Sequence, residues 1–188
     1  HTELEEALGR KILIKHDAKL SAYAEWHCAE EIKGIDRGSL AIVRSRGYGI
    51  GCGFVVNGNI VNGHLGLAGE AGYMGINFNR HKKGEEGRGT LEYSAGVESV
   101  VRYMKERLYE FPESPLNENS NYMDVFEAYK HGDELADWAV SKVAWMLGYG
   151  IANIIYIINP DCIIIGPDYP DTEDFINKIR SAVRNFVP

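Results

Sequence analysis

An uncharged, strongly apolar run from Val143 to Pro160, VAWMLGYGIANIIYIINP, constrains the fold of this chain more than any other stretch. Its length is close to the roughly 18 apolar residues that can span a membrane. However, Asn153 and two glycines interrupt it, and a second apolar run, CIIIG, follows at residues 162–166. A core helix followed by a parallel strand buried on both faces accounts for both runs. We therefore predict a core helix from about Asp133, a buried strand after it, and no membrane contact.

The remaining segments alternate between strand and helix patterns. Lys11–Lys15 predicts a short strand, followed by a helix from about Asp17. Apolar runs around Asn57-Gly58 predict an antiparallel hairpin, entered through the glycines at 47–53, because this dipeptide favours the positive φ values of a tight turn. Helical spacing predicts further helices at 97–108, at 122–130 and after Thr172, which is the expected N-cap. The buried face predicted for the helix from Asp17 comprises Leu20, Tyr23, Ala24, His27, Cys28 and Ile32. This order of elements indicates an α/β fold.

Composition excludes several classes of function. The chain has 188 residues and a formal net charge of −7, which argues against nucleic-acid binding through this part of the protein. Its three cysteines are far apart and form no C-x-x-C pair, so we expect neither a disulfide framework nor a cysteine zinc site. A reducing cytoplasm is the simplest setting. Because the chain starts at His1 and not at Met, we expect it to be part of a longer protein.

Single motifs leave alternatives open. Asp17 is either an N-cap or a general base at the end of a strand. The stretch GYGIGCG lets backbone N–H groups approach a phosphate, or it forms a twisted hairpin entry, and IIIGP is equally ambiguous. Glu70 and Glu92 are either solvated loop carboxylates or ligand contacts.

The order of the motifs is more specific. Asp17 before a helix, GYGIGCGFVVNGNIVNG, GLAGEAGYM, GRGTLE and LGYGIANIIYIINPDCIIIG resemble, in sequence and spacing, the ROK family of sugar kinases and sugar-responsive repressors. The resemblance runs from about Leu8 to the end. It implies an actin-like ATPase (ribonuclease H-like) fold, with residues 1–33 ending a first lobe and residues 34–188 forming a second α/β lobe with a flexible connector at 110–121. The aspartate-glycine-glycine-threonine strand of the first lobe and the winged helix of the repressors are absent from this sequence.

The resemblance implies a set of sugar-binding residues. Asp17 matches the aspartate that binds a sugar hydroxyl and acts as the base in the kinases. His16 stands in place of a sugar-binding asparagine. Glu70 and Glu92 match two sugar-contacting glutamates, and Tyr73 replaces a histidine that contacts both sugar and zinc.

The zinc site of the family is not expected here. Lysine and threonine are poor zinc ligands at neutral pH, so we predict no zinc. Packing around Tyr73 and Met74 is expected to do part of the work of ordering the loop, with a mobile middle at Arg80–Gly89. The four positions that match the family's zinc ligands are Tyr73, Lys83, Glu85 and Thr90.

The nucleotide side of the family pattern is degenerate. Tyr48 replaces the threonine of the phosphate loop, downstream of Arg44 and Arg46, and the paired glycines after the buried strand are reduced to Gly166-Pro167. The glycines that remain for a nucleotide are Gly47, Gly49, Gly51 and Gly166.

These features predict a cytoplasmic, homo-oligomeric effector domain of a ROK-type transcriptional regulator. It senses a sugar or sugar phosphate, needs no cofactor, and contacts DNA only through a region outside this chain. The alternative is a sugar kinase that uses Mg-ATP, with Asp17 as general base. A third hypothesis is a degenerate family member that serves only in dimerisation.

Overall fold

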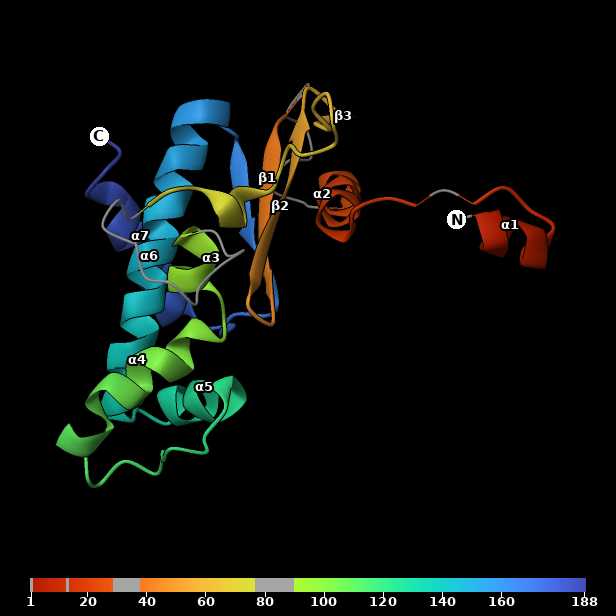
Figure 1. The fold of residues 1–188 in the computed structure, drawn as a ribbon. Coiled ribbons are helices and arrows are strands. Elements are labelled where there is room, and N and C mark those ends of the chain that lie inside the picture. The colour runs from red at the N-terminus through yellow and green to blue at the C-terminus, as the bar shows by residue number, and fades with distance from the viewer. Residues whose placement is uncertain (1, 13, 29–37, 77–89) are drawn as a thin grey trace.

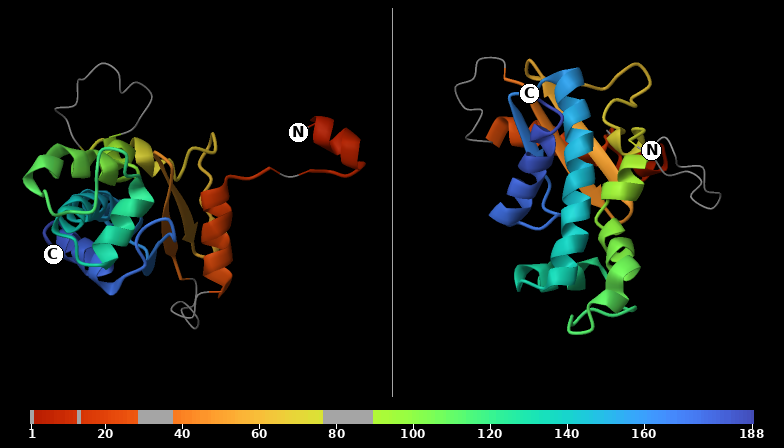
Figure 2. Two further views of the ribbon diagram at one scale, coloured as in Figure 1. Left: turned by 90° about the horizontal axis from the view of Figure 1, so that it is seen from below. Right: turned by 90° about the vertical axis from the view of Figure 1, so that its left-hand side faces the viewer.

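The computed structural model describes residues 2–12, 14–28, 38–76 and 90–188 of the chain. Its centre is a four-stranded sheet with helix α2 (Asp17–Cys28) on one face and a group of helices on the other (Figures 1 and 2). The main apolar core lies between the sheet and that group of helices, and a smaller cluster lies between the sheet and α2. This layered arrangement is the α/β class that the sequence predicts.

The sheet is mixed and has the order β3-β2-β1-β4. Its strands are β1 (Leu40–Arg46), β2 (Gly49–Val56), β3 (Asn59–Ile60) and β4 (Cys162–Ile165). β1 pairs antiparallel with β2 and parallel with β4, so the parallel strand predicted from CIIIG is confirmed. Its predicted burial on both faces is wrong in degree: β4 is only half-buried, because it forms an edge of the described sheet.

Two tight turns join the antiparallel strands. Asn57 and Gly58 join β2 to β3 with φ values of 49° and 76°, which confirms the predicted turn. The longer hairpin, between β1 and β2, turns at Gly47 and Tyr48, where Gly47 has a φ of 57°. The remaining glycines of the GYGIGCG stretch are therefore part of strand β2, at positions Gly49, Gly51 and Gly53.

The buried face predicted for α2 is wrong. The buried residues of α2 are Ala18, Lys19 and Ala22, whereas Leu20 and Tyr23 are 48% and 42% exposed. A Cβ added at Gly53 of β2 would lie only 2.2 Å from the carbonyl oxygen of Ala18, so the helix lies almost directly on the strand. At this separation only small side chains fit, and side-chain size decides which face packs. Of the other residues predicted on this face, the exposed ones are Ala24, His27 and Cys28, and Ile32 lies outside the described residues.

Helix α6 (Glu134–Ile158) is the core helix that the sequence predicts. By length and composition alone it could cross a membrane, but twelve of its residues are buried and it packs against four other helices. Asp133 caps it by accepting the N–H of Ala136 at 2.8 Å. The other helices of this layer are α3 (Thr90–Ala95), α4 (Ser99–Arg107), α5 (Tyr122–Lys130) and α7 (Glu173–Arg184), with the short 3₁₀ helices η2 (Ala71–Tyr73) and η3 (Leu108–Glu110).

Most of the helix predictions are confirmed. α5 has the predicted bounds, and Thr172 caps α7 by accepting the N–H of Phe175 at 3.2 Å. The predicted helix at 97–108 is divided, since α3 ends before Gly96 and α4 begins at Ser99. Its predicted apolar stripe nevertheless faces the core, where Val100 and Met104 are fully buried.

The connector between α4 and α5 is held by local contacts. Leu116 is buried, and the N–H of Asn117 donates to the Ser120 hydroxyl at 3.0 Å. Asn121 and Asp124 form a capping box at the start of α5. The flexibility expected for residues 110–121 stays a prediction.

The N-terminal segment extends away from the sheet. Helix α1 (Thr2–Leu8) buries no residue and lies apart from the body of the molecule (Figures 1 and 2). The strand predicted at Lys11–Lys15 is wrong, since its described residues form irregular chain and Ile14 is 63% exposed. A strand needs a neighbour for its backbone groups, and no described strand lies beside this segment.

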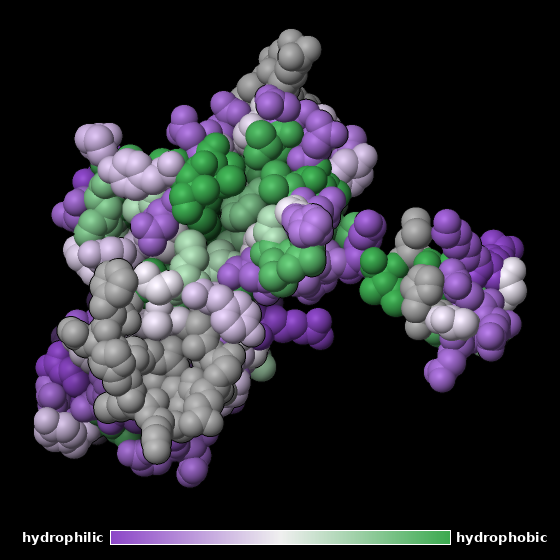
Figure 3. All heavy atoms as spheres, turned by 45° about the horizontal axis from the view of Figure 1, so that its top comes forward, coloured by the Kyte–Doolittle hydropathy of each residue, from purple (hydrophilic) through white to green (hydrophobic). Residues whose placement is uncertain are grey.

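Apolar side chains are exposed near the C-terminal end of α6. Leu67, Ile154, Ile157 and Ile158 line a shallow hollow of 200 Å³ there, and Ile157 is 75% exposed. Figure 3 shows apolar side chains gathered on this upper face. Patches of this kind are common where proteins contact one another.

Candidate functional site

A cleft of 240 Å³ opens between the N-terminus of α2, the β1–β2 hairpin and the segment around η2. The structure brings five residues predicted to bind substrate together in its lining, although they are spread over 77 positions of sequence, from residue 16 to residue 92. These residues are His16, Asp17, Glu70, Tyr73 and Glu92.

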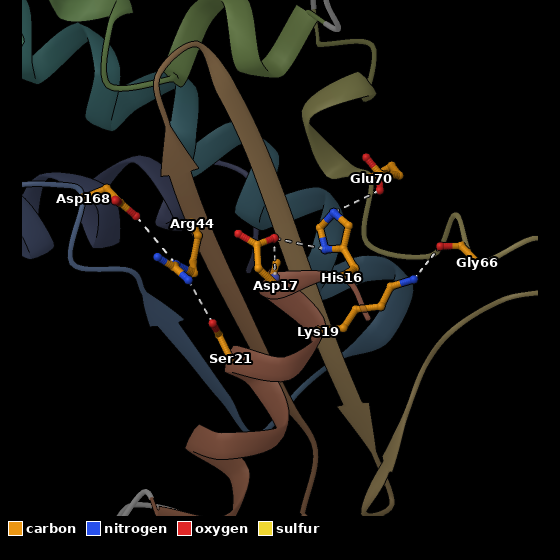
Figure 4. A network of polar contacts seen from close by, with 9 residues as sticks. His16, Asp17, Lys19, Ser21, Arg44, Gly66, Glu70 and Asp168 are labelled. Carbon is orange, nitrogen blue, oxygen red and sulfur yellow. Dashed lines mark hydrogen bonds and ion pairs between the residues drawn. The ribbon is translucent and has the colours of Figure 1, made fainter. Parts of the chain in front are cut away.

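His16 connects two of the carboxylates (Figure 4). Its Nδ1 lies 3.6 Å from Oδ1 of Asp17, and its Nε2 lies 3.4 Å from Oε1 of Glu70. The imidazole therefore stands between Asp17 and Glu70 beside the cleft. A protonated imidazole would attract both of them.

Asp17 combines the two alternatives left open by the sequence. It is the first residue of α2, and its Oδ1 accepts the N–H of Ala18 at 2.9 Å, so it does accept a backbone N–H at the start of the helix. Its side chain is nevertheless 66% exposed, and Oδ2 has no hydrogen-bond partner among the described residues. The carboxylate thus retains an oxygen for a ligand.

A close contact between backbones places Glu70. The preceding residue, Gly69, has a φ of 94°, and its carbonyl accepts the N–H of Cys52 in β2 at 2.8 Å. A Cβ on Gly69 would lie 2.2 Å from the Cys52 carbonyl oxygen, so only glycine permits this approach. Glu70 precedes η2, but its side chain makes no capping hydrogen bond and faces His16 instead.

Glu92 is the buried carboxylate of the cleft. It lies in the first turn of α3 with only 8% of its surface exposed, and its Oε2 accepts the N–H of Ile50 at 3.4 Å. Gly72 makes room for it, because a Cβ there would lie 2.6 Å from the same oxygen. Helix and strand together fix this side chain, so it forms a rigid wall of the cleft.

The glycines predicted for a nucleotide do not form one group. Gly49 and Gly51 line the cleft from strand β2. Gly47 lies in the β1–β2 turn, outside the lining, and Gly166 follows β4, where it packs against the Arg44 side chain. The described chain therefore shows a glycine-lined floor and no single glycine-rich loop around a phosphate.

Two arginines in the lining were not predicted as site residues. Arg44 and Arg46 both belong to β1 and both line the cleft. Their alternation along a strand was the signal that could have identified them, since residues two apart share a face. The sequence interpretation placed them only as neighbours of Tyr48, which is 56% exposed at the hairpin turn.

The loop in which the sequence indicates that the zinc ligands are replaced is tied by a threonine. The Thr90 hydroxyl donates to the Met74 carbonyl and accepts the N–H of Ile76, each at 2.6 Å. The hydroxyl thus both donates and accepts within the protein, and neither threonine nor tyrosine is among the usual zinc ligands. Lys83, Glu85 and the predicted mobile stretch Arg80–Gly89 lie outside the described residues.

Tyr73 and Met74 play different parts in this loop. Met74 packs against the core, as predicted, whereas Tyr73 is 61% exposed and lines the cleft. The prediction that packing around Tyr73 orders the loop is therefore wrong, because its side chain is directed to the cleft.

Two buried residues, Cys52 of β2 and Lys19 of α2, lie close to the elements that form the cleft. The Cys52 thiol is fully buried, and its burial, together with the nearby charge of Glu70, raises its pKa to about 12. It remains a neutral thiol at physiological pH and is no nucleophile. Lys19 of α2 is 5% exposed, and its ammonium donates to the carbonyl of Gly66, which ties α2 to the loop after β3 (Figure 4).

Comparison with known proteins gives this geometry a family context. The ROK family model matches residues 1–188. The chain is 32% identical to a glucokinase of Halalkalibacterium halodurans over 94% of the chain and 54% of that protein. It is 28% identical to a xylose repressor of Caldicellulosiruptor bescii over 94% of the chain and 45% of the repressor. The chain thus spans about half the length of these two relatives.

A solved structure agrees with the fold. The crystal structure of a ROK family glucokinase from Streptomyces griseus in complex with glucose and AMPPNP matches with a TM-score of 0.83 and 23% identity, over 99% of this chain and 62% of that one. The predicted actin-like ATPase type of α/β fold is confirmed by this likeness. Because the family model matches from the first residue to the last, the chain belongs to the ROK family.

Proposed function

We propose that this chain is the sugar-sensing effector domain of a ROK-type transcriptional regulator, with its ligand, a sugar or sugar phosphate, in the 240 Å³ cleft. The observation that carries the proposal is the meeting of three carboxylates, from Asp17, Glu70 and Glu92, in one cleft. Its relatives include a xylose repressor as well as a glucokinase.

The carboxylates suit sugar recognition. An ionised carboxylate accepts hydrogen bonds at two oxygens and so can hold adjacent hydroxyl groups in a fixed geometry. Glu92 is rigid and buried, whereas Asp17 and Glu70 are more exposed and stand on either side of His16. A ligand would therefore meet one fixed acceptor and two acceptors with an imidazole between them.

The nucleotide side supports sensing over phosphoryl transfer. Tyr48 occupies the hairpin turn where the kinases have a small threonine, and Gly166 is followed by a proline. The carboxylates could therefore bind a sugar even though the residues expected to bind ATP are degenerate. A regulator of this kind would be a cytoplasmic homo-oligomer, would need neither zinc nor another cofactor, and would reach DNA through a region outside this chain. Sugar binding would act by favouring one arrangement of lobes or subunits over another.

One observation favours the kinase alternative. Asp17 keeps an oxygen exposed to the cleft, where it could take the proton of a sugar hydroxyl. Mg-ATP would supply the phosphoryl group in that case. The degenerate glycine pattern argues against it, since Gly47 and Gly166 lie outside the cleft lining.

The deciding experiment measures binding and turnover on the same full-length protein. Calorimetric titration with a panel of hexoses and pentoses is combined with an assay for sugar-dependent formation of ADP. We expect saturable binding of a sugar, loss of that binding in Asp17→Asn, and no ADP formation. The matched control is Asp171→Asn, an exposed aspartate outside the cleft, which should bind as the unaltered protein does.

Other outcomes reject the proposal in different ways. Sugar-dependent ADP formation that disappears in Asp17→Asn would establish the kinase. Absence of saturable binding for every sugar, with the protein folded and oligomeric, would favour the dimerisation module. Loss of binding in both aspartate variants would mean that Asp17 has no special role.

A further inference from the structure

Two arginines give one side of the cleft a positive character. Arg44 and Arg46 are separated by one residue on β1 and pair with Gly51 and Gly49 of β2. Residues two apart on a strand, and residues directly opposite across an antiparallel pair, project on the same face. Both arginines therefore stand on the cleft face of the sheet, beside positions that have no side chain.

The two guanidinium groups differ in how they are held. Nη1 of Arg44 donates to the Ser21 hydroxyl of α2 at 2.9 Å, and its Nε lies 3.7 Å from Oδ2 of Asp168. Arg44 is thus committed to joining α2 to the loop after β4. Arg46 is exposed and makes no hydrogen bond or ion pair with the described residues.

Gly49, the residue of β2 that pairs with Arg46, is not required to be glycine by the packing of its neighbours. A Cβ added at Gly49 would meet no atom nearer than 3.7 Å, so the protein itself does not require glycine there. This contrasts with Gly53, where an added Cβ would lie 2.2 Å from a backbone oxygen. Gly49 therefore leaves open space next to an arginine that pairs with none of the described residues.

The charges of the cleft are divided by position. In Figure 4, Arg44 and Asp168 lie on one side of Asp17, and His16 and Glu70 lie on the other. Asp168 already balances Arg44, while Arg46 brings a second positive charge that forms no ion pair within the described part of the chain. Hydroxyl groups suit the carboxylates, including Glu92, whose Oε2 would lie 3.9 Å from a Cβ on Gly49, and an anionic group suits the exposed guanidinium of Arg46.

We propose that the ligand of this cleft is a sugar that carries an anionic group, a phosphate ester or a carboxylate, which Arg46 binds. Arg44 is a positioning residue that fixes the strand and helix around it. The inference rests on the proposed function, because it assumes a sugar in this cleft, and it names the chemical class of that sugar. Arginine suits the task because its planar guanidinium can donate two parallel hydrogen bonds to a phosphate or carboxylate.

The test is a calorimetric titration of the full-length protein with matched ligands. The panel pairs neutral hexoses and pentoses with their phosphate esters and their sugar acids, and includes inorganic phosphate alone. We expect one anionic sugar to bind at least about tenfold more tightly than its neutral counterpart, with a difference that shrinks at high salt. Comparing phosphate esters with sugar acids identifies which anion is recognised.

Variants assign the effect to Arg46. Arg46→Ala should weaken binding of the anionic sugar by about tenfold to a hundredfold, as expected for loss of a charged hydrogen bond, and change that of the neutral sugar by less than about twofold. Arg46→Lys, which keeps the charge, should recover part of the loss. Arg180→Ala removes an exposed arginine on α7, outside the cleft, and should have no effect.

The inference and the proposed function fail in different ways. Equal affinity for neutral and anionic sugars, or an equal loss for both in Arg46→Ala, would overturn the inference while leaving a sugar-binding cleft in place. A failure of every sugar to bind would overturn both. Thermal unfolding of each variant, compared with the unaltered protein, ensures that a lost affinity is not a lost fold.

Discussion

Gly53→Ala tests whether close packing of α2 on the sheet is what positions the cleft. An added Cβ would lie 2.2 Å from the Ala18 carbonyl oxygen and 2.6 Å from the Ala22 Cβ. Real Cβ atoms essentially never approach other heavy atoms closer than 3.0 Å. The helix and the strand must therefore move apart by at least 0.8 Å, the difference between 3.0 and 2.2 Å. A backbone oxygen cannot rotate away, so the movement must involve the helix or the strand.

The expected cost can be estimated from two opposing effects. Overpacking of this kind costs about 1–3 kcal/mol of the free energy of unfolding. Replacing glycine by alanine also restricts the unfolded chain, which returns about 0.4–1 kcal/mol. The two effects combine to about 0–2.6 kcal/mol, and because the clash is with a backbone oxygen we expect Gly53→Ala to lower the free energy of unfolding by about 1–2.6 kcal/mol. Because α2 begins at Asp17, directly after His16, sugar binding should weaken as well.

Gly51→Ala is the matched control on the same strand. Its added Cβ would lie 3.4 Å from the Ala18 Cβ and 3.5 Å from Cε1 of His16, which are ordinary contacts. We expect a change in stability within about 0.5 kcal/mol. Urea unfolding followed by tryptophan fluorescence measures both variants, since Trp26 lies on α2. Equal stability of the two variants would refute the claim that close packing at Gly53 seats the helix.

Three further outcomes are expected. Thr90→Val should lower the free energy of unfolding by about 1–2 kcal/mol through loss of its two hydrogen bonds, while Thr90→Ser should not, and urea unfolding of the pair decides this. The Tyr129 hydroxyl lowers the pKa of Asp174, so the ionised carboxylate stabilises the fold fully above its unfolded pKa near 3.8. Asp174→Asn should therefore cost less than about 1 kcal/mol at pH 7, and this cost should begin to shrink below about pH 4 and be lost as the pH falls through the lower folded pKa. Burial and a raised pKa should protect Cys52 from alkylation while the exposed Cys28 reacts, as mass spectrometry of the native and the urea-unfolded protein can check.

Local signals predicted the elements whose ends are set by nearby side chains. Asn121 and Asp124 form a capping box at the start of α5, and Thr172 caps α7, so the sequence contains the start of each helix. The long apolar run of α6 predicted a core helix, and twelve residues of this helix are buried. These features need no knowledge of distant segments.

Features that depend on distant partners were not accessible in the same way. Larger apolar residues such as Leu20 and Tyr23 marked the wrong face of α2, because the separation between helix and sheet is decided by Gly53, which lies outside the helix. The strand expected at residues 11–15 failed because a strand is defined by its neighbour. The set of cleft residues came from the resemblance to a family, since no spacing rule joins His16 to Glu92.

The glycine-rich character of the chain can be explained without a phosphate loop. Gly53 admits the helix that carries Asp17, Gly69 permits the backbone contact that places Glu70, and Gly72 leaves room for Glu92. Each of the three carboxylates thus depends on one glycine whose added Cβ would collide with the backbone or with the carboxylate itself. GYGIGCG, which by sequence was equally a phosphate loop or a hairpin entry, is a turn and a strand, and its Gly53 admits the helix that carries Asp17. Substituting these glycines should therefore impair sugar binding whether or not the protein binds a nucleotide.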